Sequence, residues 1–427
     1  MRALVSCLVL TAFAVTACTS GGDDEAPPAP SFAPAAAPAV GLSLLDGLAS
    51  PLRVGVVVTG TGARGEGTDV AAPAAGARVA EFRLDRSGTN RMDLDVVDDG
   101  GTAEGAVAAT ERLVAGGVAG IVYASAGAHL DGALQVAAAG QTAVLLPYET
   151  RPVAAGTTWH TGPSEDQVAD QVAALLADRG QRAPLVLSGE GTGGPLAELA
   201  DPARRATLTA GDALATDVAT AAAALTGGTA DALVVSASAG TSAEAVAAVQ
   251  GLLPSVPVVL GPAALAPAFA DRLTELGAAG GATTAGQFLA VGPAVADTDS
   301  SPAVVDFLAA LRLAAQDTAL PALTGAGSFA DGSAATADTA SHDAVLSLAA
   351  AASAAGSARP ADVLAALRGL TADAGTGLAG PELTFGSAQA LGDDGVGVLQ
   401  ATTRGSGRGV SAQAPALSWF VLPRAES

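Results

Sequence analysis

The chain of 427 residues contains no lysine, only two cysteines and few aromatic residues, and each scarcity narrows what the protein can be. All 20 basic residues are arginines, against 42 acidic residues, which gives a formal charge of −22. So negative a surface repels phosphate backbones, and we therefore expect no binding to nucleic acid. Trp159 and Trp419 are the only tryptophans. A sugar site built on stacked rings is therefore unfavourable.

Catalytic and metal-binding patterns are also missing. The three histidines stand alone, without a G-x-S-x-G motif, a paired histidine ligand or a cysteine nucleophile, which argues against an enzyme and a metal site. Asp93, Asp95, Asp98 and Asp99 lack the spacing of a calcium loop. Gly60–Gly65 and Gly189–Gly194 match G-x-G-x-x-G, but such matches arise by chance among 53 glycines, so we expect no dinucleotide or other cofactor.

The amino terminus has the pattern of an export signal. Met1-Arg2 precedes an apolar run from Ala3 to Val15, too short to span a bilayer comfortably. It ends in Val15-Thr16-Ala17-Cys18, which is similar to a bacterial lipobox and predicts removal of residues 1–17 and lipidation of Cys18. An ordinary signal peptide with an incidental cysteine is the alternative. The prediction places the protein on the extracytoplasmic face of the cell membrane, held by a lipid anchor.

Residues 18–52 then read as a disordered tether. They are rich in Gly, Ser, Asp, Glu, Pro and Ala, and five prolines between Pro27 and Pro38 prevent a helix from propagating. A flexible coil of this length spans something like 30 Å. The folded part should therefore stand clear of the membrane.

Three strand-like runs follow, with a helix between the last two. Val54–Val58 is an apolar run ended by turn residues, Leu94–Val97 is a second extended run, and Gly120–Tyr123 is a third. Between the last two, Thr102 can cap a helix that begins at Ala103. This order predicts a right-handed crossover in a parallel sheet, with ligands beyond the carboxyl ends of the strands.

The same alternation continues along the chain. Ser164-Glu165-Asp166-Gln167 and Thr241-Ser242-Ala243-Glu244 are capping boxes, and Pro184–Ser188, Ala232–Ser236 and Val256–Leu260 read as strands. Two successive sets predict an α/β protein with two doubly wound parallel-sheet lobes and a cleft between them.

Several stretches resemble the type I periplasmic binding proteins, most closely the leucine/isoleucine/valine-binding branch that delivers solutes to ABC importers. The stretches are 53–60, 96–101, 108–122, 280–285, 301–307, 360–370, 377–385 and 396–404. The resemblance implies three crossings between lobes, near Gly162, Ala285 and Ala388. Lobe 1 would then comprise 53–162 and 286–387, and lobe 2 would comprise 163–285 and 388–427, joined by a three-strand hinge.

The resemblance also implies a ligand site. In amino-acid-binding members, two loops of the first lobe hold the ligand carboxylate with hydroxyl and backbone N–H groups. The first loop matches Ser125, Ala126 and Gly127, which precede an expected helix and can offer N–H groups to an anion. The second loop matches Tyr148, Glu149 and Thr150. A capped helix start or a plain turn is the alternative for each loop.

The second lobe departs from the family pattern. Ser188-Gly189-Glu190-Gly191 replaces a Tyr-Gly pair, and Gly261-Pro262-Ala263-Ala264 has no acid for a ligand ammonium group. Glu149, Asp166 or Glu190 could supply that acid, or the ligand lacks an ammonium group, or the cleft binds nothing. We include Glu190 among the expected contacts.

These features together predict a monomeric solute-binding lipoprotein. Its lobes would close on a small polar solute, an amino acid or a similar molecule, and present it to an ABC permease. The alternative keeps the fold and drops transport: an envelope sensor or interaction lipoprotein with a degenerate cleft.

Overall fold

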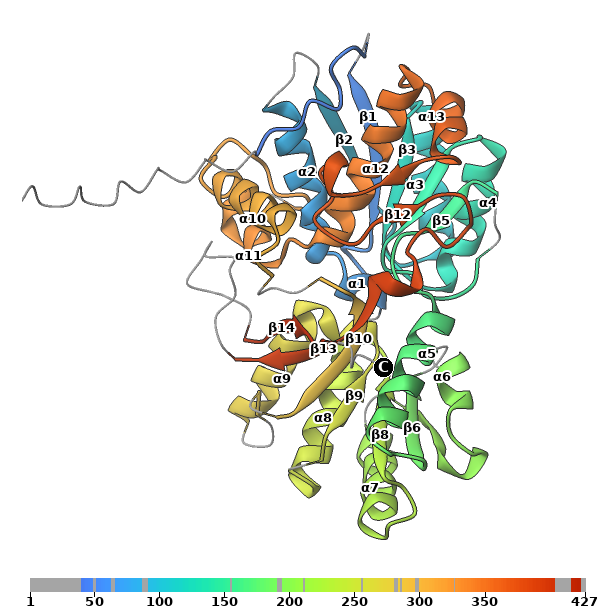
Figure 1. Cartoon of the computed structure of the whole chain (residues 1–427), viewed down its shortest axis with the longest axis vertical. Helices are drawn as coiled ribbons and strands as arrows, with labels where there is room; N and C mark the ends of the chain where they lie inside the picture. The colour runs from blue at the N-terminus through green and yellow to red at the C-terminus, as the bar shows by residue number, and fades with distance from the viewer. Residues whose placement is uncertain are drawn as a thin grey trace, which may run out of the picture. The chain divides into compact units, whose positions relative to one another are not determined.

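Two large β-sheets organise the residues described by the computed structural model (Figure 1). The described ranges are 40–48, 51–62, 66–86, 91–153, 156–189, 194–209, 212–254, 256–279, 283–284, 286–295, 299–325, 327–403 and 416–423. The predicted signal segment 1–17, Cys18 and Glu190 lie outside these ranges.

The first sheet has five parallel strands in the order β2-β1-β3-β4-β5. They are β1 (Leu52–Val58), β2 (Met92–Asp98), β3 (Gly120–Ala124), β4 (Ala143–Leu146) and β5 (Thr158–His160). One face packs against α2 (Gly76–Asp85), α12 (Thr339–Ala355) and α13 (Pro360–Leu367), and the other against α3 (Ala103–Ala115) and α4 (Asp131–Ala139). Val56 lies in the core on the first face and Val57 in the core on the second, as expected for a strand covered on both sides.

The second sheet has seven strands in the order β14-β13-β10-β9-β8-β6-β7. They are β6 (Pro184–Gly189), β7 (Arg205–Leu208), β8 (Ala232–Ser236), β9 (Val258–Leu260), β10 (Phe288–Pro293), β13 (Val396–Thr402) and β14 (Ser418–Val421). One face packs on α5 (Glu165–Asp178) and α6 (Gly194–Glu198), the other on α7 (Asp212–Thr226), α8 (Ala239–Leu252) and α9 (Pro267–Ala278). β13 and β14 form an antiparallel hairpin, so this sheet is mixed and not wholly parallel.

The chain passes between the sheets more than once. It leaves the first sheet after β5, returns after β10 with α10 (Pro302–Ala314) packed on α2, and goes back to the second sheet at β13. The remaining elements are α1 (Glu66–Asp69), α11 (Ser333–Thr336), β11 (Thr371–Ala372) and β12 (Leu383–Thr384).

Two predicted boundaries need correction. Because β10 pairs with β9 and β13, residues 288–293 belong to the second sheet, although the predicted first-lobe range 286–387 includes them. Residues 388–390 still run beside β5, since the His160 N–H donates to the Ala388 carbonyl over 2.8 Å. The crossings predicted near Ala285 and Ala388 therefore lie farther along the chain.

The predicted tether 18–52 extends too far. Leu45 and Leu48 are only 1% and 6% exposed and belong to the same apolar core as Leu52, the first residue of β1. The Leu42 N–H also donates to the Arg83 carbonyl of α2, over 3.1 Å. Packing of these leucines outweighs the loop-like composition, and the described part of the fold begins at residue 40.

Local capping rules predicted two of three helix starts correctly. Thr102 accepts from the Gly105 N–H and α3 begins at Ala103, as predicted. Ser164 forms the predicted capping box at the start of α5. The box predicted at Thr241 is wrong, because the Ser238 hydroxyl accepts the Thr241 N–H and α8 begins at Ala239.

A buried chain of polar side chains links α2 to α12. The Arg83 guanidinium lies 3.1 Å from Nε2 of His342, whose Nδ1 lies 2.6 Å from Asp343 Oδ1. Arg83 also donates to the Gly377 carbonyl (2.9 Å), and Asp343 accepts the Ala379 N–H (2.9 Å). Arg83 and His342 are 2% and 0% exposed, so this polar chain fixes the 377–380 loop from inside the core.

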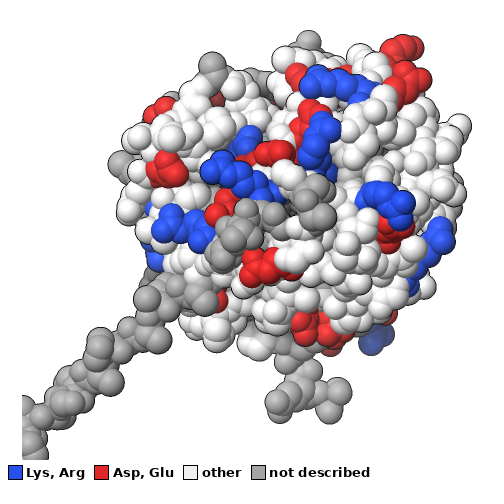
Figure 2. Space-filling view, turned by 90° about the horizontal axis from the view of Figure 1, so that it is seen from above, with Lys and Arg blue, Asp and Glu red and all other residues white. Residues whose placement is uncertain are grey.

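The surface charges are mixed on the face shown in Figure 2, where basic and acidic side chains lie beside one another. Ion pairs among the described residues include Arg53 with Asp95 at 3.0 Å and Arg359 with Asp362 at 2.7 Å. Of the helices within the described ranges, none is both long and apolar enough to cross a membrane.

Candidate functional site

The loop after β3 carries the first predicted contact, Ser125, inside a closed hydrogen-bond network. Its hydroxyl lies 2.6 Å from Thr59 Oγ1 and 3.2 Å from His129 Nε2. The same His129 nitrogen lies 3.1 Å from Asp99 Oδ2. A catalytic triad needs the serine and the acid on opposite nitrogens of the ring, so this serine, histidine and aspartate do not form one.

The loop after β4 supplies a carboxylate to the first loop. Glu149 is 1% exposed, and its Oε2 accepts the backbone N–H of Gly127 over 2.9 Å. Arg151 contacts both oxygens of this carboxylate. Its guanidinium lies 2.8 Å from Oε2, and its backbone N–H donates to Oε1 over 2.9 Å. The N–H that was expected to meet a ligand anion therefore meets an anion of the chain itself.

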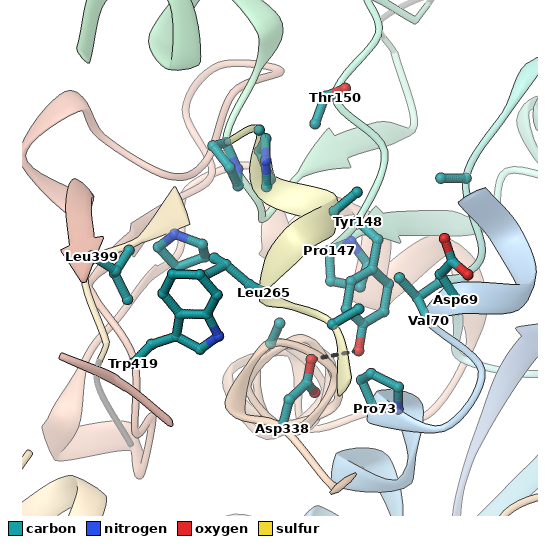
Figure 3. Close-up of a pocket in the computed structure, with 18 of the residues that line it drawn as sticks. Asp69, Val70, Pro73, Pro147, Tyr148, Thr150, Leu265, Asp338, Leu399 and Trp419 are labelled. Atoms are coloured by element: carbon teal, nitrogen blue, oxygen red, sulfur yellow. Dashed lines mark hydrogen bonds between the residues drawn. The ribbon is translucent and has the colours of Figure 1, made fainter. Parts of the chain in front are cut away.

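Beside these loops, residues of both sheets and their helices line a cavity of about 250 Å³. Figure 3 shows Thr150, Tyr148 and Asp69 toward one end, and Leu265, Leu399 and Trp419 toward the other. The rest of its lining is mainly apolar and includes Val70, Val168, Leu196, Phe307, Leu308 and Leu417. A mostly apolar pocket with a few converging polar groups is the usual form of a small-molecule site.

Tyr148 joins the cavity wall to the start of α12. Its hydroxyl donates to Asp338 Oδ2 over 2.8 Å, as drawn in Figure 3. Burial, together with the neighbouring Asp338 charge, raises the pKa of Tyr148 well above its usual value. The phenol therefore stays protonated, and Asp338 also accepts from the Ser341 N–H (3.1 Å) as the helix cap.

Two further acids line the cavity. Asp69 of α1 accepts the Ala239 N–H at the start of α8 over 2.8 Å, which makes a contact across the cleft. Glu165 is the first residue of α5, and its own N–H donates to the Thr150 carbonyl over 2.9 Å. Burial, and then the Glu149 charge, raises the pKa of the Glu165 carboxyl, while Arg151 opposes the shift.

The predicted contacts divide into two sets. Ala126, Tyr148 and Thr150 line the cavity. Ser125 and Glu149 are 0% and 1% exposed and are not part of its wall; together with Gly127 they bond to residues of their own lobe. Among the described residues, the acidic residues that line the cavity are Asp69, Glu165 and Asp338, which were not among the predicted contacts.

Sequence signals for the missed residues were weak. Glu165 stands next to Asp166, which was considered as the acid for an ammonium group, inside a correctly predicted capping box. Asp338 occupies a helix cap, but only the fold brings that cap to Tyr148, 190 positions away in the sequence. Within the described ranges, no group of three or more His, Cys, Asp or Glu side chains could hold a metal ion.

Comparison with solved structures identifies the architecture. The branched-chain amino acid transporter substrate binding protein LivJ of Streptococcus pneumoniae, in complex with isoleucine, aligns with a TM-score of 0.62 at 16% identity, over 87% of this chain and 99% of that one. A periplasmic binding protein type 1 of Bordetella pertussis aligns with a TM-score of 0.62 at 16% identity, over 83% and 98%. The chain has the type I periplasmic-binding-protein fold.

The type I fold is shared with proteins whose names state different ligands. A fatty acid ABC transporter substrate-binding protein of Thermomonospora curvata aligns with a TM-score of 0.61 at 15% identity, over 87% of this chain and 93% of that one. No family model and no curated protein sequence matches the chain. At such identities the likeness defines the fold, and the ligand must be argued from the cleft of this chain.

Proposed function

We propose that this protein is an extracytoplasmic solute-binding lipoprotein. It captures a small, amino-acid-like solute between its two lobes and delivers it to an ABC permease. The observation that carries the proposal is the cavity of about 250 Å³, because both sheets and their helices contribute to its wall. A ligand that touches both lobes only when they are closed shifts the equilibrium toward closure, and this is how such folds signal occupancy.

The anchor in this proposal rests on the sequence Val15-Thr16-Ala17-Cys18. Lipidation of Cys18 would keep the protein at the outer face of the membrane, beside a permease. Replacement of Cys18 by alanine should release the protein from the membrane fraction and abolish labelling with a palmitate analogue. A Cys18→Ala variant that stays membrane-bound and labelled would exclude this anchor.

The two tryptophans offer a direct assay of the cleft. Trp419 lines the cavity, whereas Trp159 lies in the core of the first lobe, where its indole N–H donates to the Phe385 carbonyl over 3.1 Å. Titration of the purified protein with amino acids, amides, dicarboxylates and amines should change Trp419 emission for a true ligand. A ligand at a hundred times its dissociation constant should also stabilise the fold by about 2.7 kcal/mol.

Two variants locate the response. Trp419→Phe should lose the fluorescence change but keep thermal stabilisation by the ligand, and Trp159→Phe should keep both. A response that survives in Trp419→Phe and disappears in Trp159→Phe would place the ligand elsewhere and contradict the proposal.

One observation favours the alternative, a sensor or interaction lipoprotein without transport. Two groups expected to hold a ligand carboxylate, the Ser125 hydroxyl and the Gly127 N–H, bond instead to Thr59 and Glu149 of the same chain. If no solute of any class alters the emission or the stability of the cooperatively folded protein, this alternative replaces the transport function.

A further inference from the structure

Among the described residues, the wall of the cavity that would hold the solute contains acidic residues but no basic one. Its ionisable groups include Asp69, Glu165 and Asp338, and none of the arginines or histidines in the described ranges contributes to it. Against this described wall a ligand carboxylate would find no cation to pair with, and like charges placed side by side in a desolvated site repel strongly.

The loop that could otherwise offer backbone donors to a carboxylate is already filled. The Gly127 N–H donates to Glu149 Oε2 over 2.9 Å, and Arg151 neutralises that carboxylate at 2.8 Å. Glu149 is only 1% exposed, so a ligand anion would have to displace this internal ion pair to reach the Gly127 N–H.

The neighbouring hydroxyl is covered as well. Helix α1 lies over Ser125 so closely that a Cβ on Gly67 would stand 2.8 Å from both Ser125 Oγ and Thr59 Oγ1. Ser125 is fully buried and is not part of the cavity wall. Two of the groups expected to hold a carboxylate, the Gly127 N–H and the Ser125 hydroxyl, are thus closed by the chain itself.

Of the three acids, Glu165 is the one free for a ligand. Asp69 accepts the Ala239 N–H, and Asp338 accepts the Tyr148 hydroxyl and caps α12. The Glu165 side chain has no hydrogen-bond or ion-pair partner among the described residues. Gly194, at the start of α6 in the same lobe, lies close beside it, because a Cβ there would stand only 3.0 Å from Oε2; a glycine at this position therefore keeps a side chain away from the carboxylate.

The rest of the wall suits an apolar body. From the acid end the cavity continues past Leu196 and Leu265 toward Leu399 and Trp419. An alkyl or aryl group placed there would leave contact with water, which favours binding in proportion to the apolar area buried.

We propose that the solute is a primary amine with an apolar body and no carboxylate, and that Glu165 receives its ammonium group. This inference rests on the proposed function, because it names the ligand class of the same cleft. Burial raises the pKa of Glu165, and a bound cation would offset the cost of keeping that carboxylate charged.

The test uses probes that differ only in the polar head. Isothermal titration of the purified protein would compare 3-methylbutylamine with leucine, which adds a carboxylate to the same skeleton, and with 3-methylbutan-1-ol, which lacks the charge. Phenethylamine with phenylalanine, and hexylamine with hexanoate, extend the comparison to aryl and linear bodies. We expect each amine to bind about 100-fold more tightly than its carboxylate-bearing partner.

A matched pair of variants tests the assigned acid. Glu165→Gln should weaken amine binding about 30-fold, because an ammonium group loses its charged partner. Asp166→Asn removes the same charge from the next residue of α5, which is exposed and outside the cavity wall, and should leave the affinity unchanged.

The outcomes separate the two levels of inference. Leucine, hexanoate or the alcohol binding as tightly as the amine would overturn the amine assignment and leave solute binding standing. If Glu165→Gln and Asp166→Asn changed amine affinity equally, Glu165 would not be the residue that receives the ammonium group, and the proposal would be overturned. A protein that binds none of the probes and none of the wider solute panel would refute the proposed function together with this inference.

Discussion

His342 provides a quantitative test of how the buried polar chain responds to pH. The ring is fully buried, with Arg83 on Nε2 at 3.1 Å and Asp343 on Nδ1 at 2.6 Å. Burial lowers the pKa of His342, Asp343 opposes the shift and Arg83 adds to it. Between about pH 6.5 and the lower folded-state pKa, the unfolded chain therefore binds a proton that the folded protein does not.

The sign and size of the effect follow from that difference. The contribution of His342 to stability is complete above about pH 6.5 and is lost as the pH falls toward the folded-state pKa, by about 1.4 kcal/mol per pH unit. His342→Gln has no proton to take up. Its stability should be lower at every pH, since Arg83 loses a partner, but should fall less steeply on acidification.

The assay is urea unfolding followed by circular dichroism from about pH 5 to about pH 8, the range in which such groups titrate. Burial also lowers the pKa of His160, which acts with the same sign. Because His160 and the acidic groups are present in both proteins, the difference between the two slopes reports His342 alone. Parallel stability curves for wild type and variant would refute the neutral, buried state of this histidine.

Three substitutions, two of them with a matched control, test the packing of the fold, each by urea unfolding. Gly67→Ala should lower the free energy of unfolding by about 1–3 kcal/mol, because the new Cβ would meet two hydroxyl oxygens at 2.8 Å. Its control is Gly251→Ala, which has nothing within 4 Å of the new Cβ and should stabilise α8 by about 0.5–1 kcal/mol. Equal effects of the two substitutions would contradict the close contact at Gly67. Glu149→Gln should lower the stability by about 3 kcal/mol, because it removes the buried carboxylate that pairs with Arg151 at 2.8 Å and leaves only the more distant Asp131; an unchanged stability would argue against this ion pair. Leu348→Ala, at a fully buried position, should cost about 2–5 kcal/mol, while Leu252→Ala, at 54% exposure, should stay within about 0.5 kcal/mol.

Much of the scaffold could be read from local sequence patterns. The apolar run Val54–Val58 lies within β1, and Ala232–Ser236 coincides with β8, because buried parallel strands need apolar residues on both faces. Helix α5 begins directly after Ser164 because the cap uses residues adjacent in sequence. Such features depend on neighbours only, so one sequence is enough to predict them.

Features that depend on distant residues were harder to predict. The predicted first-lobe range includes Phe288–Pro293, and only the pairing of this strand with β9 and β13 shows that it joins the second sheet. Likewise, Glu149 and Gly127 were both predicted at the site, but nothing in the sequence indicated that one would occupy the donor of the other. Because the fold brings the two residues together, Glu149 and Gly127 form a hydrogen bond with each other instead of two contacts with a ligand.

The Glu149 carboxylate on Gly127 behaves as a tethered competitor. A short tether holds a group near its target at an effective concentration of at least about 1 mM, and a folded loop holds it more firmly than a flexible linker. A free carboxylate solute would have to exceed that concentration merely to share the donor. In this chain a single side chain that reaches back to its own backbone therefore occupies a donor that a carboxylate solute would otherwise have to win.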